Sequence, residues 1–338
     1  DGSNYMGIGT HLKYYIEEGG TYFDITPIRK TVTNAITFSA SNTSSNVTVT
    51  SSSHGATQFD FVTISGAVSL GGLITASVLN QEYQIASITN NNSFVIVAKD
   101  TSGNTVTANA SDSGNGGSGV DGVYQINVGL NTSVGGNGWG AGGWGGINAD
   151  LTTFGWGESA DSGTLAELRL WTHDNFGEDL LFNPRDGALF YWDKSDGLTS
   201  RAVLLSSESG ASDVPTIAKQ ILVSDIDRHI IAFGANTLGT AIQDPLLIRF
   251  SSQESLTKWT PDTTNTAGDL RLSSGSTFVQ AVETKQQILV FTDRSLFSMR
   301  FIGPPFTFGL QELSKNITIM SPNSAVAVDD IVIWMGKE

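Results

Sequence analysis

Ile288-Leu289-Val290-Phe291 is one of four short hydrophobic segments that decide the fold of this chain, each ending in an aromatic residue. The others are Asp179-Leu180-Leu181-Phe182, Ile230-Ile231-Ala232-Phe233 and Ile331-Val332-Ile333-Trp334, and successive segments begin 51, 58 and 43 residues apart. Their β-branched and aromatic content is typical of strands. Around two of them the match extends over 16 positions without a gap, between Ile221–Asn236 and Val279–Arg294. We therefore expect one repeated structural unit, with Phe233, Phe291 and Trp334 at equivalent buried positions.

Further predicted strands lie on both sides of these segments. The preceding ones are Leu165–Thr172, Ile217–Ser224, Phe278–Glu283 and Ala325–Val328, and the following ones, each after a turn, are Ala188–Trp192, Pro245–Phe250 and Leu296–Phe301. A period of 43–58 residues with three or four strands per unit is typical of a β-propeller, in which each blade packs against its neighbours. The fourth unit reaches residue 338 halfway through its hairpin, so we expect the ring to continue beyond it.

The distribution of charge indicates a second domain. Residues 31–150 carry seven charged side chains, whereas residues 151–338 carry 37. The charge-poor part contains runs that alternate with period 2, such as Ile36–Ser39 and Phe94–Val97, separated by polar turn residues. The chain is therefore predicted to be all-β, and a small barrel or sandwich is inserted into the propeller.

The predicted layout has four parts. They are N-terminal strands of the propeller or platform (1–31), the inserted β-domain (32–123), a return strand with a Gly/Trp-rich arm (124–157), and at least three propeller blades with a partial fourth (158–338). The flanks of the insertion, Thr26–Lys30 and Tyr124–Val128, are expected to be adjacent strands of the parent domain.

Composition excludes several classes of protein. The 338 residues include no cysteine, which excludes disulfides, cysteine-ligated zinc, iron–sulfur clusters and thiol catalysis. The formal net charge of −15 argues against binding nucleic acid or an anionic membrane by charge neutralisation. No run of apolar residues is long enough for a transmembrane helix, so no membrane insertion is expected.

The motifs that could carry chemistry have simpler interpretations. The residues Gly114-x-Gly116-x-x-Gly119 match the sequence pattern of the dinucleotide-binding fingerprint. A predicted strand follows them, however, whereas that fingerprint needs a helix at this place. His229 lies near Asp225 and Asp227, which would suit a base and its orienting acid. Because Asp225 falls at the same repeat position as Glu283, with Asp329-Asp330 at the corresponding turn, the acids that recur there are interpreted as solvated turn residues. We therefore predict no catalytic, metal-binding or cofactor-binding residues.

Trp139, Trp144 and Trp156 stand among many glycines in the arm between the two parts of the chain. One interpretation is an irregular connector whose tryptophans pack onto a neighbouring domain. The other is an extended arm whose tryptophans contact an adjacent subunit, because buried aromatic residues dominate the energy of interfaces.

Longer stretches resemble a known family. Tyr14–Arg29 resembles the start, and Leu170–Leu180 the first blade, of structural proteins from marine bacteriophages. Later blades of the same proteins are similar to Trp259-Thr260-Pro261, Gly268–Ser276 and Gly303–Gly309. These proteins are similar to the nozzle or hub proteins of short-tailed (podovirus-like) phages. The resemblance covers most of 1–31 and 124–338, and no catalytic residue comes with it.

The resemblance implies a non-enzymatic component of the virion tail. It would assemble with itself as a ring of six copies around the DNA-ejection channel, and contact adaptor or portal-proximal proteins and fibres. Genomic DNA would pass without sequence-specific binding, because an acidic channel does not hold the phosphates.

Two other functions stay open. One is a receptor- or glycan-binding virion module, with the inserted domain as the binder and exposed aromatics such as Tyr83 as sugar platforms. The other is a propeller-type glycoside hydrolase, which would need two carboxylates facing each other across a cleft.

Overall fold

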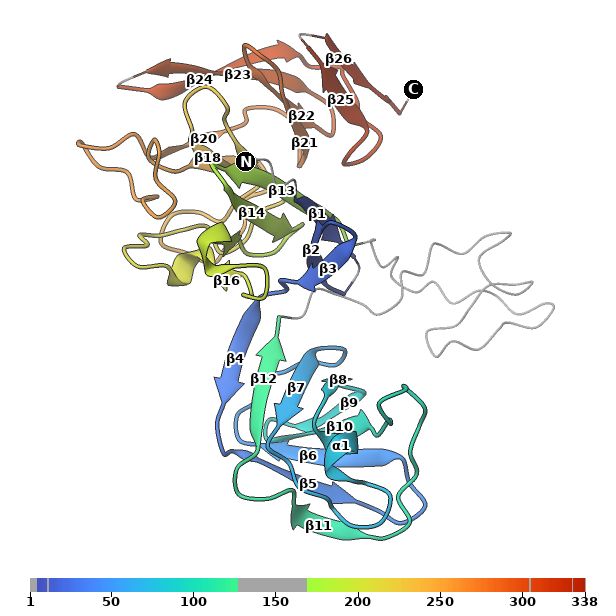
Figure 1. The fold of residues 1–338 in the computed structure, drawn as a ribbon. Coiled ribbons are helices and arrows are strands. Elements are labelled where there is room, and N and C mark those ends of the chain that lie inside the picture. The colour runs from blue at the N-terminus through green and yellow to red at the C-terminus, as the bar shows by residue number, and fades with distance from the viewer. Residues whose placement is uncertain (1–4, 11, 127–168, 304, 330, 338) are drawn as a thin grey trace, which may run out of the picture. The chain divides into compact units, whose positions relative to one another are not determined.

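The structure is a computed structural model that describes residues 5–10, 12–126, 169–303, 305–329 and 331–337 (Figure 1). It is all-β, with several antiparallel four-stranded sheets, and its one described α-helix is the short α1 (Ala76–Leu79). None of the helices in this part of the chain has the length and hydropathy needed to span a bilayer. The chain divides into two compact units. Unit 1 comprises Asp1–Gly7, Ile16–Ile25 and Leu170–Glu338, and unit 2 comprises Ile8–Tyr15 and Thr26–Arg169.

The first three strands form a small sheet near the N-terminus. Its order is β1 (Met6–Gly9), β2 (Tyr14–Glu18) and β3 (Thr21–Asp24). The turn between β2 and β3 is Gly19-Gly20, in which both residues have positive φ. Glycine adopts this conformation without steric cost, and it matches the twist of a tight hairpin.

Unit 2 contains two antiparallel sheets that share one core. The first has the order β11-β5-β6-β10-β9, from β5 (Ile36–Ala40), β6 (Asn46–Ser51), β9 (Ser87–Asn90), β10 (Ser93–Val97) and β11 (Asp112–Asn115). The second has the order β4-β12-β7-β8, from β4 (Ile28–Val32), β7 (Phe61–Ser65), β8 (Glu82–Gln84) and β12 (Asp121–Gln125). Alternation along β6 buries Val47 and Val49, and these pack with Val62 and Phe94 in a single cluster.

The strands that flank the inserted segment are adjacent, and they belong to unit 2. β12 pairs with β4 through Gly122 and Val32, and on its other side with β7 through Gly122 and Ile64. Unit 2 therefore takes in residues from Thr26 onward instead of starting at residue 32. The physical reason is that β4 and β12 complete a sheet whose remaining strands lie inside the insertion.

One glycine of the literal dinucleotide fingerprint has a packing role. Gly116 has φ +125°, and a Cβ at this position would collide with the ring of Phe38. The strand β12 follows these glycines. No helix N-terminus is therefore available there to hold a pyrophosphate.

Unit 1 contains three consecutive four-stranded antiparallel sheets and a two-stranded one, each paired in chain order. Sheet 1 is β13 (Trp171–Phe176), β14 (Asp179–Pro184), β15 (Phe190–Trp192) and β16 (Val203–Leu204). Sheet 2 is β17 (Gln220–Val223), β18 (Ile230–Phe233), β19 (Leu247–Phe250) and β20 (Gly268–Arg271). Sheet 3 is β21 (Phe278–Glu283), β22 (Ile288–Thr292), β23 (Leu296–Gly303) and β24 (Thr307–Ser314), and sheet 4 is β25 (Ala325–Val328) and β26 (Ile331–Trp334). Each of the four hydrophobic segments lies in the second strand of its sheet. The described residues do not form a closed ring of sheets.

Hydrogen bonds between first strands define which residues are equivalent in these sheets. The hydroxyl of Thr172 in sheet 1 accepts from the backbone N–H of Ile221 at 3.1 Å. The Gln220 amide in sheet 2 bonds both the N–H and the C=O of Ala281, each at 2.9 Å. The Gln280 amide bonds Ala325 in the same two ways, also at 2.9 Å. Ile221, Ala281 and Ala325 therefore hold equivalent positions.

The predicted equivalence of the aromatic residues is wrong for Trp334. Phe233 and Phe291 are fully buried, whereas Trp334 is 39% exposed. Across the ladders, Ile221 pairs with Ala232 and Ala325 pairs with Trp334, so Trp334 takes the place of the alanine instead of that of Phe233. A shift of one residue turns a strand side chain to the opposite face, and the indole accordingly packs back on the Phe291 ring at 5.7 Å.

Consecutive sheets bury the faces that they turn toward one another. Leu181 of sheet 1 packs with Ile221 and Ala232 of sheet 2. The opposite face of sheet 2 packs on sheet 3, and Phe233 stacks on Phe278 with ring centroids 5.0 Å apart. Each large apolar side chain buried in this way contributes about 1.5–3 kcal/mol, so sheet-to-sheet contacts hold unit 1 together.

Candidate functional site

Carboxylates converge on the end of β17 from both neighbouring sheets. Asp174 in β13 accepts a hydrogen bond from the backbone N–H of Val223 at 2.8 Å. Glu283, the last residue of β21, accepts one from the backbone N–H of Asp225 at 3.1 Å. Each acid thus holds the backbone of sheet 2, where β17 leads into its turn.

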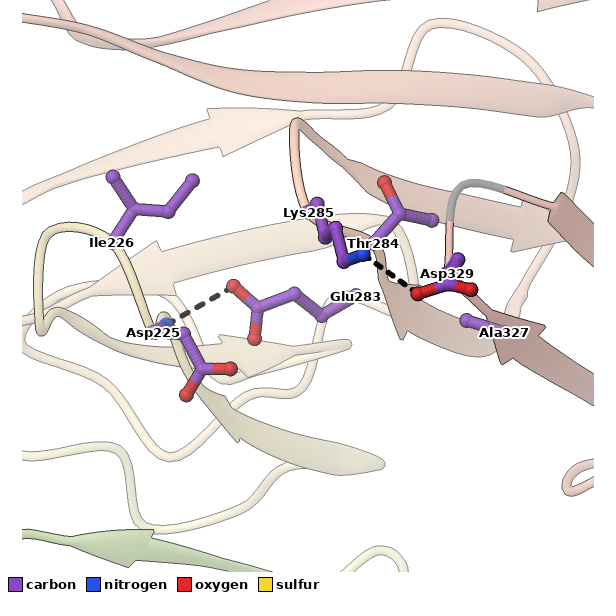
Figure 2. A pocket seen from close by; sticks show the side chains of 7 residues that line it. All are labelled: Asp225, Ile226, Glu283, Thr284, Lys285, Ala327 and Asp329. Atoms are coloured by element: carbon purple, nitrogen blue, oxygen red, sulfur yellow. Dashed lines mark hydrogen bonds and ion pairs between the residues drawn. The ribbon is translucent and has the colours of Figure 1, made fainter.

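A pocket of about 440 Å³ opens beside this cluster. Its lining residues are Asp225, Ile226, Glu283, Thr284, Lys285, Ala327 and Asp329. Figure 2 shows the Glu283 carboxylate turned toward Asp225, whereas Lys285 points to Asp329, with which it forms an ion pair of 2.6 Å. Both members of that pair are mostly exposed, so water screens their attraction and leaves the pair little stabilising energy.

Burial changes the proton affinity of the two acids. It raises the pKa of Glu283 to about 7, and the neighbouring carboxylates of Asp225 and Asp174 act in the same direction, against the hydrogen bond from Asp225. Burial also raises the pKa of Asp174, although hydrogen bonds from Val223 and Asn175 oppose it. Desolvation disfavours the charged form of a carboxyl group, and nearby negative charge adds to that penalty. Glu283 can therefore gain or lose a proton near neutral pH.

His229 is brought together with Asp227 but not with Asp225. Its Nδ1 lies 3.0 Å from an Asp227 carboxylate oxygen, and its Nε2 lies 2.9 Å from the Thr266 hydroxyl. The ring is fully buried between aromatic side chains, and Phe308 contacts it edge-on at 5.1 Å. Both nitrogens are occupied inside the protein, so this pair serves the packing of sheets 2 and 3.

Two interpretations of these acids are corrected by the structure. Glu283 is half-buried, so it is not a solvated turn residue, whereas Asp225 is exposed and Asp227 beside it is buried. Glu283 pairs with Ile288 as Val223 pairs with Ile230, so Glu283 is equivalent to Val223 and not to Asp225. The ungapped alignment fails here because the connection between β17 and β18 (224–229) is two residues longer than that between β21 and β22 (284–287).

Four aromatic residues were also predicted to contact partners or sugars. Trp139, Trp144 and Trp156 lie outside the described residues. Tyr83 is buried and donates its hydroxyl to the Val78 carbonyl, so it is no platform for a sugar. Among the described residues, no group of three or more His, Cys, Asp or Glu side chains is arranged to hold a metal ion.

Sequence reasoning missed the residues that join the sheets. Gln220 and Gln280 stand at one position of the repeat, and each bonds the backbone of the next first strand. Arg185, in the turn after β14, donates to the backbone carbonyls of Phe278 and Val279 in sheet 3 at 3.4 and 3.2 Å. The sequence signal that could have identified Gln220 and Gln280 is a polar residue within an apolar strand, because a buried amide group needs a hydrogen-bond partner.

Comparison with known proteins does not place the chain in a family. No protein-family model matches it, and no curated protein sequence does. Among solved structures, one of those that align is a phage phi92 endosialidase, with a TM-score of 0.26 and 12% sequence identity. That alignment covers 96% of this chain and 51% of the other, so the chain spans about half the length of the protein it matches. At this TM-score the likeness carries no argument about fold or function.

Proposed function

We propose that this chain is a non-enzymatic structural component of a bacteriophage tail, of the nozzle or hub type, that forms part of an oligomeric ring around the DNA-ejection channel. Its consecutive sheets are the blades of a β-propeller, which serves as a rigid frame. The observation that carries the proposal is the serial joining of sheets through their first strands, by Gln220 to Ala281 and by Gln280 to Ala325.

The arrangement of the sheets supports the propeller. In a propeller, blades stand around an axis with their first strands innermost, and each blade packs its two faces against its two neighbours. In this chain β13 contacts β17, β17 contacts β21, and β21 contacts β25. Within each of these sheets the strands pair in chain order.

The sequence stretches that resemble phage proteins lie in strands of the sheets and in their connections. Leu170–Leu180 covers β13 and its turn into β14 within sheet 1, and Gly268–Ser276 covers β20 and the connection from sheet 2 to sheet 3. Only the second of these two stretches joins one sheet to the next. The resemblance therefore supports a shared framework better than a shared active site.

The acidic surface suits a passage for DNA. The formal net charge is −15, and a wall with the sign of the phosphates does not retain the duplex through counterion release. In a closed ring, every subunit contact is the same, so one type of contact builds the whole collar. A ring of six copies is the assembly that the phage resemblance implies.

A cryo-EM map of the particle that contains this chain tests the proposal. We expect density for the chain as a collar that surrounds an axial channel wide enough for duplex DNA. Density at the tip of a peripheral fibre would contradict it, as would a monomer in solution that cleaves an oligosaccharide.

A receptor- or glycan-binding module is a second candidate, favoured by the separate core of unit 2. A fragment of residues 28–125 would then bind host cells or host polysaccharide by itself. Binding that survives in this fragment and disappears when it is deleted from the chain would favour this candidate over the collar.

A propeller-type hydrolase is a third candidate, favoured by the pocket in which Glu283 faces Asp225 (Figure 2). A carboxyl group with a pKa near 7 has the proton affinity of a general acid in glycoside hydrolysis. Cleavage of an oligosaccharide by the chain, abolished in Glu283→Gln, would support a hydrolase and contradict the structural role.

A further inference from the structure

The outer face of sheet 4 carries a ladder of exposed aliphatic side chains. Val326 lies opposite Ile333, and Val328 lies opposite Ile331, so all four point to the same side of the hairpin. Val326 and Ile333 are 56% and 61% exposed, and Val328 and Ile331 are 57% and 66% exposed. The neighbouring Met335 is also exposed. Such a contiguous apolar surface is typical of an interaction site.

The same face is covered in the two preceding sheets. The pair equivalent to Val326 and Ile333 is Leu222 and Ile231 in sheet 2, and it is Val282 and Leu289 in sheet 3. Both of those pairs are buried.

The cover is in each case the next sheet along the chain. Leu222 and Ile231 pack under Ala281 and Val290 of sheet 3. Val282 and Leu289 pack under Ala325 and Val332 of sheet 4. The ladder therefore continues an interface that is already formed twice in this molecule.

We propose that this face docks a further antiparallel β-sheet of the same repeat, supplied by polypeptide outside residues 1–338. At each of the three existing interfaces between consecutive sheets, the incoming sheet presents one small and one larger apolar residue opposite each other, and we expect the partner sheet to do the same. These pairs are Ile221 with Ala232, Ala281 with Val290, and Ala325 with Trp334. The inference rests on sheet packing alone and holds whether or not the protein belongs to a phage tail.

The absence of cysteine from the chain allows a direct test. Ile333→Cys introduces a single thiol in the ladder, and Ile242→Cys introduces one at a position that is 73% exposed in unit 1, away from sheet 4. Each variant is treated with a maleimide, both as the isolated chain and in the native assembly. A maleimide that carries a photo-crosslinker then identifies what lies against the thiol of the Ile333→Cys variant.

In the isolated chain both thiols should react rapidly. In the native assembly we expect the thiol of Ile333→Cys to react at least about tenfold more slowly than in the isolated chain. A tenfold protection corresponds to a free energy of ~1.4 kcal/mol for opening the interface. The thiol of Ile242→Cys should keep its rate. The crosslinked peptide should come from a β-strand outside residues 1–338. Unchanged reactivity of the Ile333→Cys thiol would overturn the proposal, and so would a crosslink to residues 1–338, which would show that this chain itself, in the same copy or in a second one, covers the face.

Discussion

Glu283 shows at the scale of one residue how burial and neighbouring charge act together. Its side chain accepts a hydrogen bond from Asp225, but it lies among the carboxylates of Asp225, Asp174 and Asp227, and burial removes the water that would stabilise its charge. The result is a pKa near 7, well above the value of 4.5 for a free glutamate. Such a group couples the stability of unit 1 to pH.

The contribution of Glu283 to the stability of unit 1 should fall as pH rises from about 4.5 to about 7. Because the pKa of Glu283 is higher in the folded chain than in the unfolded chain, the folded chain binds the proton more tightly. The stabilisation is therefore complete at pH values below the pKa of the unfolded chain and is lost above the pKa of the folded chain. Glu283→Gln keeps the acceptor oxygen and removes the charge. It should raise the free energy of unfolding at pH 8 by about 1–3 kcal/mol and flatten this pH dependence.

Urea unfolding at pH 5 and pH 8 measures this effect. Glu178→Gln is the matched control, because that carboxylate is 80% exposed. An equal stability of the wild type and Glu283→Gln at pH 8 would show that the buried charge imposes no penalty.

Phe291 and Trp334 should differ in their contribution to stability, because the Phe291 ring is fully buried and the Trp334 ring is partly exposed. Phe291→Ala leaves a cavity between sheets 3 and 4 and should cost about 3–5 kcal/mol of unfolding free energy. Trp334→Ala should cost about 1–2 kcal/mol, because less apolar area leaves water on folding. Urea denaturation of both variants gives the comparison, and equal losses would contradict the register described above.

At the scale of the element, side-chain amides connect one strand to the next sheet. Gln280 is buried and satisfies both backbone groups of Ala325, which no strand of sheet 3 could reach by ladder pairing. Gln220 does the same for Ala281. The first strands are thereby held side by side by directional bonds as well as by apolar contact.

Gln280→Ala should loosen sheet 4 in particular. It leaves the buried N–H and C=O of Ala325 without partners, which should cost about 1–3 kcal/mol. We expect faster amide hydrogen exchange in β25 and β26, with unit 2 unchanged. The exposed Gln58, whose amide donates to the Ala86 carbonyl in unit 2, provides the control Gln58→Ala, which should leave exchange in sheet 4 as it is. Unchanged exchange in both variants would mean that apolar packing alone holds sheet 4.

At the scale of the whole molecule, the chain holds two cores of different composition. Unit 2 is poor in charge and rich in small polar residues, yet it closes a core between two sheets, from Ile36 to Tyr124. Unit 1 builds a series of cores between consecutive sheets.

Residues 28–125 should fold without the rest of the chain. This fragment contains both sheets and the whole core cluster, and its ends are adjacent, since the N–H of Ile126 donates to the Pro27 carbonyl at 3.0 Å. We expect dispersed amide resonances and a cooperative urea transition. A fragment without dispersed resonances would show that unit 2 depends on residues outside it, whereas a fragment that starts at residue 32 should fail because it lacks β4.

The sequence by itself determined the all-β class, the position of most strands and the repetition of one unit. These follow from local properties, because period-2 alternation and β-branched runs are visible in any strand that buries one face. Ile36–Ser39 and Ile230–Phe233 were located correctly in this way. The rejection of the dinucleotide fingerprint around Gly116 had the same local basis, since a strand and not a helix follows it.

Only the tertiary structure decided which face each aromatic residue occupies and which acids meet. Strand side chains alternate, so a shift of one residue, invisible in a repeat that ends in Phe or Trp, turned Trp334 to the face opposite to that of Phe233. Glu283 and Asp225 meet because one ends a strand of sheet 3 and the other lies in a turn of sheet 2. Contacts of this kind depend on sheet packing across 58 residues of chain, and no pattern within either segment encodes them.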